Sequence, residues 1–155
     1  MRNYIPVIDK IDKKLVNLMQ NDFPLSRTPY QDIAKKIGID RDEVITRLIK
    51  LYESDIIRKI GAILSARKIG YITTLAAVSV SKEQLDKVAN IINSYDGVTH
   101  NYLREGMPNI WFTLTEPNQK ILDKHLRDIE RKINNKIIRM PAKKIFKIGV
   151  KFAIR

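Results

Sequence analysis

A histidine, a tyrosine and an arginine occupy every second position of the stretch that leads into a tight turn. His100, Tyr102 and Arg104 precede the turn at Glu105 to Pro108. Because side chains alternate between the two faces of a β-strand, a strand here would point these three the same way, together with Val98. The spacing therefore predicts one face that carries a titratable imidazole, a phenol and a cation.

The residues after the turn alternate in the same way. Apolar side chains at every second position from Ile110 to Leu114 suit packing under helices, whereas Asn109, Trp111 and Thr113 would point to the opposite face. If the two strands pair as a hairpin, this second set joins His100, and the shared face favours a flat, anionic ligand. Such a face is also compatible with a dimer interface, and the spacing alone leaves both interpretations open.

Composition excludes several kinds of site. The 155 residues include no cysteine and only two histidines, His100 and His125, so disulfides and thiolate nucleophiles are absent and a protein-only zinc site is disfavoured. His125 falls beside an apolar helical stripe, and we interpret it as a packing or surface residue. The start of the chain, interrupted by Pro6, Asp9 and Lys10, lacks the apolar middle of a secretory signal, and no apolar run could span a membrane. The sequence therefore predicts a cytoplasmic protein.

The net charge of +12 is distributed unevenly along the chain. Residues 1–60 hold 12 Lys or Arg against 9 Asp or Glu, and residues 61–155 hold 17 against 8. Residues 131–155 contain nine basic residues and no acidic one. The positive charge is thus concentrated in the second half, where it favours an anionic partner.

Residues 1–64 have the outline of a winged helix-turn-helix domain. Apolar residues recur at helical spacing from Ile8 to Met19, Pro29 opens a second helix, and Asp40 caps a third. The segment from Ile56 to Leu64 is typical of a wing.

The third of these helices is a poor candidate for reading DNA. In a DNA-binding helix-turn-helix its first turns face the major groove, yet here Asp40, Asp42 and Glu43 stand there against Arg41 and Arg47. We interpret the first domain as an inherited scaffold that no longer reads DNA.

Residues 65–155 follow the order strand, helix, strand, strand, helix, strand of a ferredoxin-like domain. The first strand is expected over residues 71–80 and the last around 137–140, and the two helices are expected to begin at Ser81 and Pro117. A basic C-terminal tail follows and is a candidate for one more strand. The predicted fold class is α+β: an N-terminal winged helix-turn-helix followed by a ferredoxin-like βαββαβ domain.

This architecture resembles the Lrp/AsnC family of regulators over nearly the whole chain. The central hairpin departs from the regulators, because it has Pro108, Asn109 and Trp111 in place of a turn rich in Gly and Asp. It resembles instead the siroheme decarboxylases, an offshoot of the same family. The residues that carry this resemblance are Gly61 to Tyr71 and Gly97 to Leu114, the second of which keeps His, Asn, Tyr, Arg, Pro, Asn, Trp and Phe in the family's order.

The resemblance implies an enzyme of the alternative haem biosynthesis pathway. Such enzymes remove carbon dioxide from two acetate side chains of siroheme to give didecarboxysiroheme, usually as two related subunits that share a cavity. The chain is more similar to the A-type subunit, because it has Ser65 and Ala66 where a B-type chain would have a histidine before Arg67. The resemblance therefore implies a heterodimer with a B-type paralogue, a homo-oligomer being the alternative, and a missing imidazole that the partner supplies. It implies no required cofactor beyond the iron that siroheme itself carries, and bound haem could co-purify.

For such a substrate the candidate catalytic residues are His100 and Tyr102. We expect His100 to deliver a proton and Tyr102 to orient or replace it. As an alternative, neutral His100 could be an axial ligand to the substrate's iron, or it could be merely hydrogen-bonded at a subunit interface. Arg67 and Arg104 are expected to bind those carboxylates of siroheme that remain on the product. Trp111 is expected to exclude water from the acetate carboxylate that is lost. The candidate substrate-binding residues are Arg67, Lys68, Asn101, Arg104 and Trp111.

Two other functions remain open at the level of sequence. The first is an Lrp/AsnC-type transcriptional regulator that binds DNA through its first domain and a small effector through its second, against which the acidic third helix and Trp111 argue. The second is a haem sensor in which the His100 face binds a tetrapyrrole without reacting. Binding and chemistry would share residues, so an activity assay is needed to separate them.

Overall fold

The computed structural model describes residues 7–147, 149, 151, 153 and 154, and the chain divides into two compact units. The first unit comprises Met1–Ala62 and Lys147–Arg155, and the second comprises Ile63–Phe146. The division falls close to the expected boundary after residue 64, but the end of the basic tail groups with the first unit. Ile154 packs against the apolar core of the first unit, and its backbone is bound by Asn17: Asn17 Nδ2 donates to the carbonyl oxygen at 2.9 Å and Asn17 Oδ1 accepts from the N–H at 3.0 Å.

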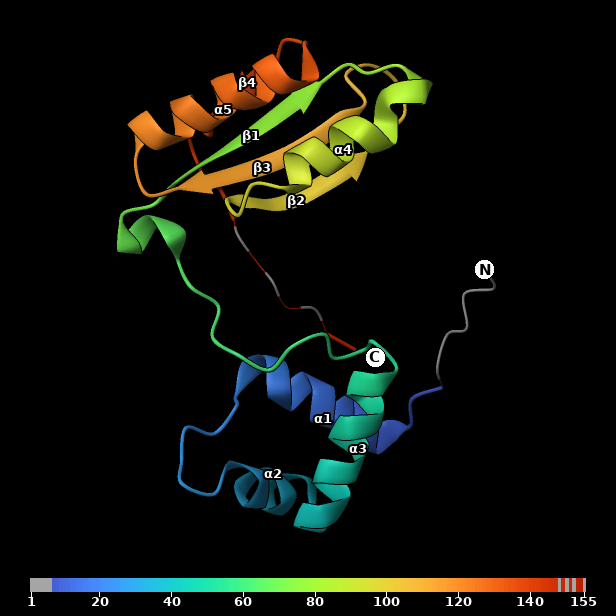
Figure 1. The fold of residues 1–155 in the computed structure, drawn as a ribbon. Coiled ribbons are helices and arrows are strands. Elements are labelled where there is room, and N and C mark those ends of the chain that lie inside the picture. The colour runs from blue at the N-terminus through green and yellow to red at the C-terminus, as the bar shows by residue number, and fades with distance from the viewer. Residues whose placement is uncertain (1–6, 148, 150, 152, 155) are drawn as a thin grey trace. The chain divides into compact units, whose positions relative to one another are not determined.

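The first unit is a three-helix domain of helix-turn-helix type (Figure 1). Asp9 and Asp12 form a reciprocal capping box at the start of the first helix, and Gly38 ends the second in the left-handed conformation that glycine tolerates best. The helices are α1 (Lys10–Asn21), α2 (Pro29–Ile37) and α3 (Arg41–Glu53). The predicted wing is wrong: residues 56–64 are described throughout and contain no strand.

The core of the first unit follows the predicted apolar stripes. One face of each helix turns inward, and Leu15, Ile33 and Val44 are fully buried where the three helices meet. Burying a side chain of this size contributes about 1.5–3 kcal/mol. The apolar faces of the three helices therefore form the core of this unit, and no wing contributes to it.

The second unit is a four-stranded antiparallel sheet with the strand order β2-β3-β1-β4, which confirms the ferredoxin-like topology. The last helix begins at Gln119 and not at Pro117, and Asn118 caps it by accepting a hydrogen bond from the N–H of Ile121 at 3.0 Å. No further strand forms among the described residues of the basic tail. The elements are η1 (Ala66–Ile69), β1 (Ile72–Val78), η2 (Lys82–Gln84), α4 (Leu85–Asn93), β2 (Val98–Leu103), β3 (Ile110–Glu116), α5 (Gln119–Ile133) and β4 (Ile138–Met140).

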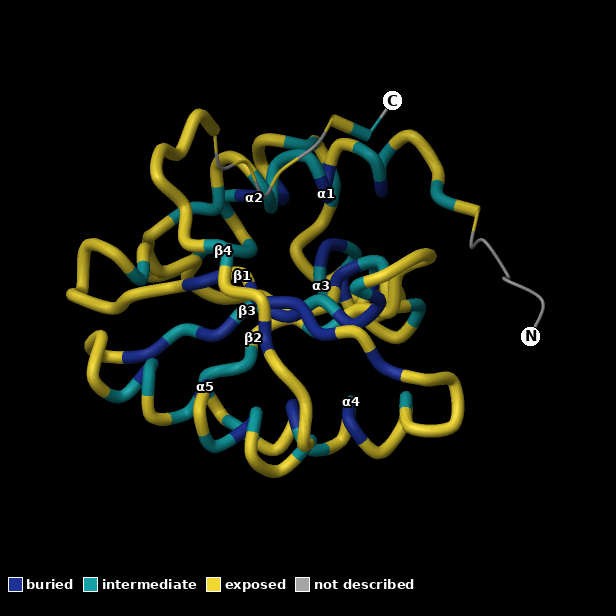
Figure 2. Tube along the Cα trace, turned by 90° about the horizontal axis from the view of Figure 1, so that it is seen from above, coloured by how far each residue is buried: buried dark blue, intermediate teal, exposed yellow. Residues whose placement is uncertain are grey.

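Both long helices of the second unit cover the same face of its sheet. Figure 2 shows α4 and α5 side by side along that face. Ile110, Phe112 and Leu114 of β3 are at most 2% exposed and pack there against Ile92 and Leu126 of the two helices, as predicted. No α-helix of this unit covers the opposite face, which we call the open face. Side chains on the open face are therefore not packed under α-helices of their own unit.

Candidate functional site on the open face

A β-bulge in β2 decides which residues reach the open face. Val98 pairs with Leu114, but the next pair is His100 with Thr113, so Thr99 is an extra residue in β2. Val98 consequently packs against the helix-side core while His100 faces the other way. The prediction that Val98 shares the face of His100 is wrong for this reason.

The bulge surrounds one nitrogen of His100 with hydroxyl groups. Its Nδ1 lies 3.1 Å from Thr99 Oγ1 and 3.3 Å from Thr113 Oγ1, and the two hydroxyl oxygens lie 2.6 Å apart. The imidazole is exposed, and its ring centroid lies 6.0 Å from that of Tyr102. His100 is thus held from the strand side and accessible from the open side.

Tyr102 and Arg104 continue the row, as the alternation predicted. The guanidinium carbon of Arg104 lies 4.7 Å from the centre of the Tyr102 ring, a cation–π contact. The Arg104 backbone N–H donates to the carbonyl oxygen of Asn109 at 2.7 Å and closes the hairpin. Trp111 lies opposite Tyr102, and its indole N–H donates to the carbonyl oxygen of Pro108 at 2.6 Å. The indole is therefore fixed by its polar edge and offers only its ring to a ligand.

Arg104 also borders a hollow of about 500 Å³ at the tip of the hairpin. The walls are largely apolar, with Leu85, Leu103 and Met107 among them, and Lys82 and Glu105 add one cation and one anion beside Arg104. A side chain between an aromatic ring and such a hollow is well placed to bind a carboxylate on an otherwise apolar molecule.

Beside this polar row, the open face continues over apolar residues of β1 and β4, which we call the apolar floor: Leu75, Ala77, Ile138 and Met140. Trp111 pairs with Ala77 of β1, which pairs with Ile138 of β4, while Thr113 pairs with Leu75 and Leu75 with Met140. Leu75 and Ile138 are 37% and 51% exposed on this face, which is unusual for large apolar side chains. The open face thus combines the row of His100, Tyr102 and Arg104 with exposed apolar side chains of β1 and β4.

Three of the expected substrate-binding residues lie apart from this row. Asn101 faces the helices, where its Nδ2 donates to Asn93 Oδ1 at 2.9 Å and to the carbonyl oxygen of Ala89 at 3.4 Å. Arg67 and Lys68 lie on η1, exposed and without an ion pair to any described residue. The structure brings together His100, Tyr102, Arg104 and Trp111, but not Asn101, Arg67 or Lys68.

Asn109 has a structural position that the alternation did not predict. It is buried, and its amide imitates a backbone partner: Oδ1 accepts from the Val80 N–H and Nδ2 donates to the Val80 carbonyl oxygen, both at 2.8 Å. It therefore connects the hairpin to the segment that follows β1 and does not join the open face, contrary to the prediction.

Replacing Asn109 by alanine is expected to destabilise the protein by about 1–3 kcal/mol, because two buried backbone groups of Val80 lose their partner. Urea unfolding measures this change directly. Asn101→Ala is the control, since Asn101 lies on the same hairpin with partly exposed bonds and should cost less. Equal effects of the two substitutions would contradict the assigned role of Asn109.

His125 lies away from the open face, in a network between β3 and α5. Its Nδ1 lies 2.6 Å from Glu116 Oε1, and its ring stacks edge-on against Tyr95 with centroids 5.4 Å apart. The Tyr95 hydroxyl donates to Asp128 at 2.5 Å, and burial is the first cause that raises the pKa of Tyr95. This placement agrees with the packing role predicted for His125.

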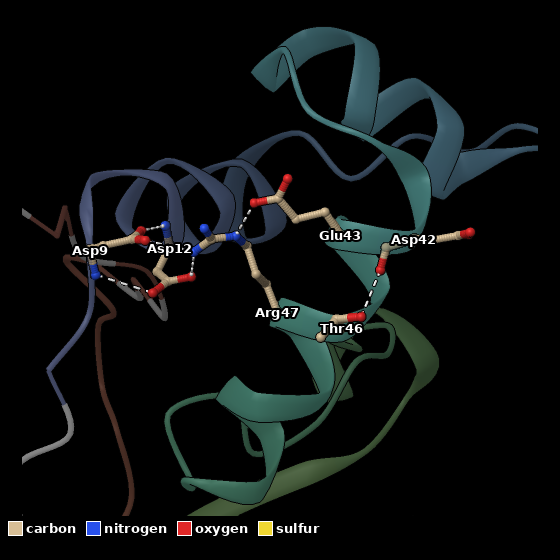
Figure 3. Close-up of polar contacts among 6 residues, drawn as sticks. All are labelled: Asp9, Asp12, Asp42, Glu43, Thr46 and Arg47. Atoms are coloured by element: carbon tan, nitrogen blue, oxygen red, sulfur yellow. Dashed lines mark hydrogen bonds and ion pairs between the residues drawn. The ribbon is translucent and has the colours of Figure 1, made fainter.

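Both arginines of α3 are paired with carboxylates of the first unit, and Figure 3 shows those around Arg47. Arg47 Nη1 lies 2.8 Å from both Asp9 Oδ2 and Asp12 Oδ1, and its Nε lies 2.8 Å from Glu43 Oε1. These side-chain hydrogen bonds raise the pKa of Arg47 above its ordinary value, so the charge is permanent but neutralised. Arg41 pairs with Asp42 at 2.9 Å. A helix whose arginines are bound to carboxylates has little positive charge to offer to phosphates.

Neither a metal site nor a membrane-spanning helix is found in the described part of the chain. Its His, Asp and Glu side chains include no group of three placed to hold a metal ion. No helix there is long and apolar enough to cross a membrane.

The fold defines a two-domain protein of the Lrp/AsnC type. The family models match on both sides of the division: a siroheme decarboxylase NirDL-like helix-turn-helix domain over residues 12–58, and an AsnC-like ligand binding domain over residues 68–147. An AsnC family transcriptional regulator from Agrobacterium tumefaciens has the same fold, with a TM-score of 0.77 and 22% identity over 94% of this chain and 96% of the regulator.

Sequence similarity narrows the class further. The siroheme decarboxylase alpha subunit of Desulfovibrio desulfuricans is 39% identical over 94% of this chain and 84% of the relative. The siroheme decarboxylase NirDL, crystallised in complex with an iron-uroporphyrin III analogue, superposes with a TM-score of 0.68 and 31% identity over 84% of this chain and 43% of that one. The chain belongs to the siroheme decarboxylase family, and the expected resemblance to the A-type subunit is confirmed.

Proposed function

We propose that this chain is a subunit of a siroheme decarboxylase and removes carbon dioxide from two acetate side chains of siroheme, giving didecarboxysiroheme. The main support for this proposal is that the chain belongs to the siroheme decarboxylase family. The open face supports it, because a flat macrocycle ringed by carboxylates matches an apolar floor bordered by Arg104, Tyr102 and His100. The regulator interpretation is disfavoured by the neutralised arginines of α3.

Each decarboxylation consumes one proton. The bond between the methylene carbon and the carboxylate breaks, carbon dioxide leaves, and the electron pair remains on the pyrrole-bound carbon until a proton converts it to methyl. We assign the delivery of this proton to His100, with Tyr102 orienting the acid or substituting for it. Trp111 and the apolar floor keep water from the reacting carboxylate, which raises its free energy relative to the transition state.

Arg104 is assigned to a carboxylate that is retained. A guanidinium that gripped the reacting carboxylate would stabilise the ground state and slow its loss. Arg67 and Lys68 remain candidates for the same role, because their exposed position on η1 leaves them able to reach a bound macrocycle.

Replacing Arg104 by alanine is expected to weaken siroheme binding about 10- to 100-fold, the loss of one charge-assisted hydrogen-bonded pair. The measurement is an anaerobic titration of the protein with siroheme, followed by absorbance, beside single-turnover rates. Arg139→Ala is the control, because that exposed arginine is paired with Asp123 at 2.7 Å. An unchanged affinity with a collapsed chemical step would show that Arg104 acts on the reacting group instead.

We further propose that the enzyme contains a second, B-type subunit. The chain spans less than half the length of NirDL, so NirDL has room for two regions of this size in one polypeptide. An imidazole that this chain lacks near Ser65 would come from that partner, and a homo-oligomer is the alternative. A cytoplasmic location stays a prediction.

The proposal requires no cofactor besides the iron of the substrate. As an alternative to its role as the acid, His100 is a candidate axial ligand to that iron. A ligand role predicts that the absorbance shift of bound siroheme is lost in His100→Ala, and a shift that persists would rule it out. The haem-sensor alternative predicts tight binding without chemistry. Mass spectrometry of the bound tetrapyrrole after anaerobic incubation separates the two, because only the enzyme changes its mass.

A further inference from the structure

The bulge in β2 produces a local arrangement that a regular strand could not. In a regular strand Thr99 and His100 would point to opposite faces. Here both reach the open face, where Thr99 Oγ1 and Thr113 Oγ1 lie 2.6 Å apart and both approach His100 Nδ1, at 3.1 and 3.3 Å. The three polar atoms form a closed triangle.

We propose that Thr99 and Thr113 are positioning residues for His100: their hydroxyls accept the Nδ1–H of the imidazole, hold the neutral ring in the tautomer protonated at Nδ1, and leave Nε2 to face the substrate. This inference rests on the proposed function for its catalytic consequence. The geometric part concerns the protein alone and can be tested without substrate.

A count of protons favours this tautomer. If Nδ1 carried no proton, the two threonine hydroxyls would have two protons for three contacts, and one contact of the triangle would remain unsatisfied. With a proton on Nδ1, one hydroxyl donates to the other and Nδ1–H is shared between both oxygens, which matches its two similar distances. All three contacts are then hydrogen bonds.

The tautomer suits a proton donor. The charged ring has protons on both nitrogens and gives up the one on Nε2. This proton forms the new C–H bond on the carbon whose bond to the departed carbon dioxide has broken. The spent ring is then protonated at Nδ1, the form that the threonines hold, so the ring neither turns nor moves its proton between nitrogens. A proton from water returns to Nε2 before the next step. In the described structure no carboxylate hydrogen-bonds to His100, in contrast to His125, which faces Glu116.

The chain contains a matched control. Thr73 and Thr115 form a second pair of hydroxyls across β1 and β3, with oxygens 2.9 Å apart, but no imidazole lies against them. Substitutions at Thr115 therefore change a hydroxyl of the same strand without touching His100.

The first test is nitrogen NMR of the full chain labelled at histidine, which has only two histidines to assign. His100→Gln identifies the His100 signals. At a pH where the ring is neutral, the wild type should carry its proton on Nδ1, and Thr113→Val and Thr99→Val should shift the proton to Nε2, the preference of a free imidazole. Thr115→Val should leave the spectrum of His100 unchanged. A wild-type proton on Nε2, or valine variants indistinguishable from the wild type, would overturn the inference.

The second test is kinetic and uses the assembled enzyme. Thr113→Val should lower the rate of the chemical step roughly 10- to 100-fold, as loss of a histidine's orienting partner does elsewhere, with little change in siroheme affinity. Thr113→Ser should restore most of the rate, and Thr115→Val should not alter it. A changed tautomer with an unchanged rate would overturn the catalytic role. If no preparation of the assembled enzyme acts on siroheme while the NMR result holds, the proposed function fails and the positioning stands.

Discussion

Replacing His100 by glutamine is expected to slow decarboxylation by about 100- to 10,000-fold, the range that a positioned acid contributes. Glutamine keeps a polar group of similar size near Thr99 and Thr113 but cannot deliver a proton. Because the apolar floor and Arg104 are untouched, siroheme should still bind. The measurement is a single-turnover rate at saturating siroheme, alongside the binding constant.

His125→Gln is the matched control for this experiment. It changes the other histidine, whose Nδ1 contacts Glu116 on the far side of the sheet, and glutamine can still donate there. We expect its rate to stay near that of the wild type. A His100→Gln enzyme that keeps its rate would transfer the acid role to Tyr102 or to the partner, and Tyr102→Phe would then distinguish these two.

Replacing Arg47 by methionine is expected to destabilise the first unit by about 2–4 kcal/mol. The side chain of Asp12 is only 9% exposed, and its carboxylate would lose the guanidinium that neutralises it. Thermal unfolding followed by circular dichroism measures the effect. Arg41→Met is the control on the same helix, because its pair with Asp42 is 58% and 83% exposed and should contribute less than about 1 kcal/mol.

The ion pairs of Arg47 with Asp9 and Asp12 should also make the stability of the first unit depend on pH in the acid range. Hydrogen bonds from the Asp12 backbone N–H and then from the Arg47 side chain lower the pKa of Asp9. A carboxyl group with a lowered pKa in the folded chain stabilises the fold above its unfolded value, about 4, and this contribution is lost as the pH falls further. Wild-type stability should therefore decline below about pH 4, and Arg47→Met should show a smaller decline. An identical acid dependence would exclude Arg47 from the network's effect.

Much of the fold could be predicted because local signals and burial agree. The apolar period of α1 and the alternation of Ile110, Phe112 and Leu114 each identify a buried face, and the topology follows from the order of elements. The predicted wing did not form: residues 56–64 pair with no other strand. A β-strand needs a partner strand for its backbone hydrogen bonds, and the sequence of one segment does not show whether such a partner lies beside it.

The candidate site was predictable only in part, for reasons of geometry. Alternation placed His100, Tyr102 and Arg104 together, since each contact among them is local to one strand. It misplaced Val98 because the bulge at Thr99 interrupts the alternation of side chains between the two faces, and no residue type in the sequence indicates such a bulge. The same bulge brought Thr99 to His100, so the hydroxyl pair was missed. Asn109 was misassigned because a buried amide that imitates the backbone has the same residue type as an exposed one.

The most direct test of the proposed function is an anaerobic incubation of siroheme with the purified chain, alone and with a B-type paralogue, followed by absorbance and mass spectrometry. The account predicts stepwise loss of two molecules of carbon dioxide in the mixture, with His100→Gln blocking it, and little or no product from the chain alone. Product from the chain alone would show that the partner is dispensable. Siroheme that binds tightly in the mixture and is recovered with its mass unchanged would contradict the decarboxylase assignment and favour a sensor.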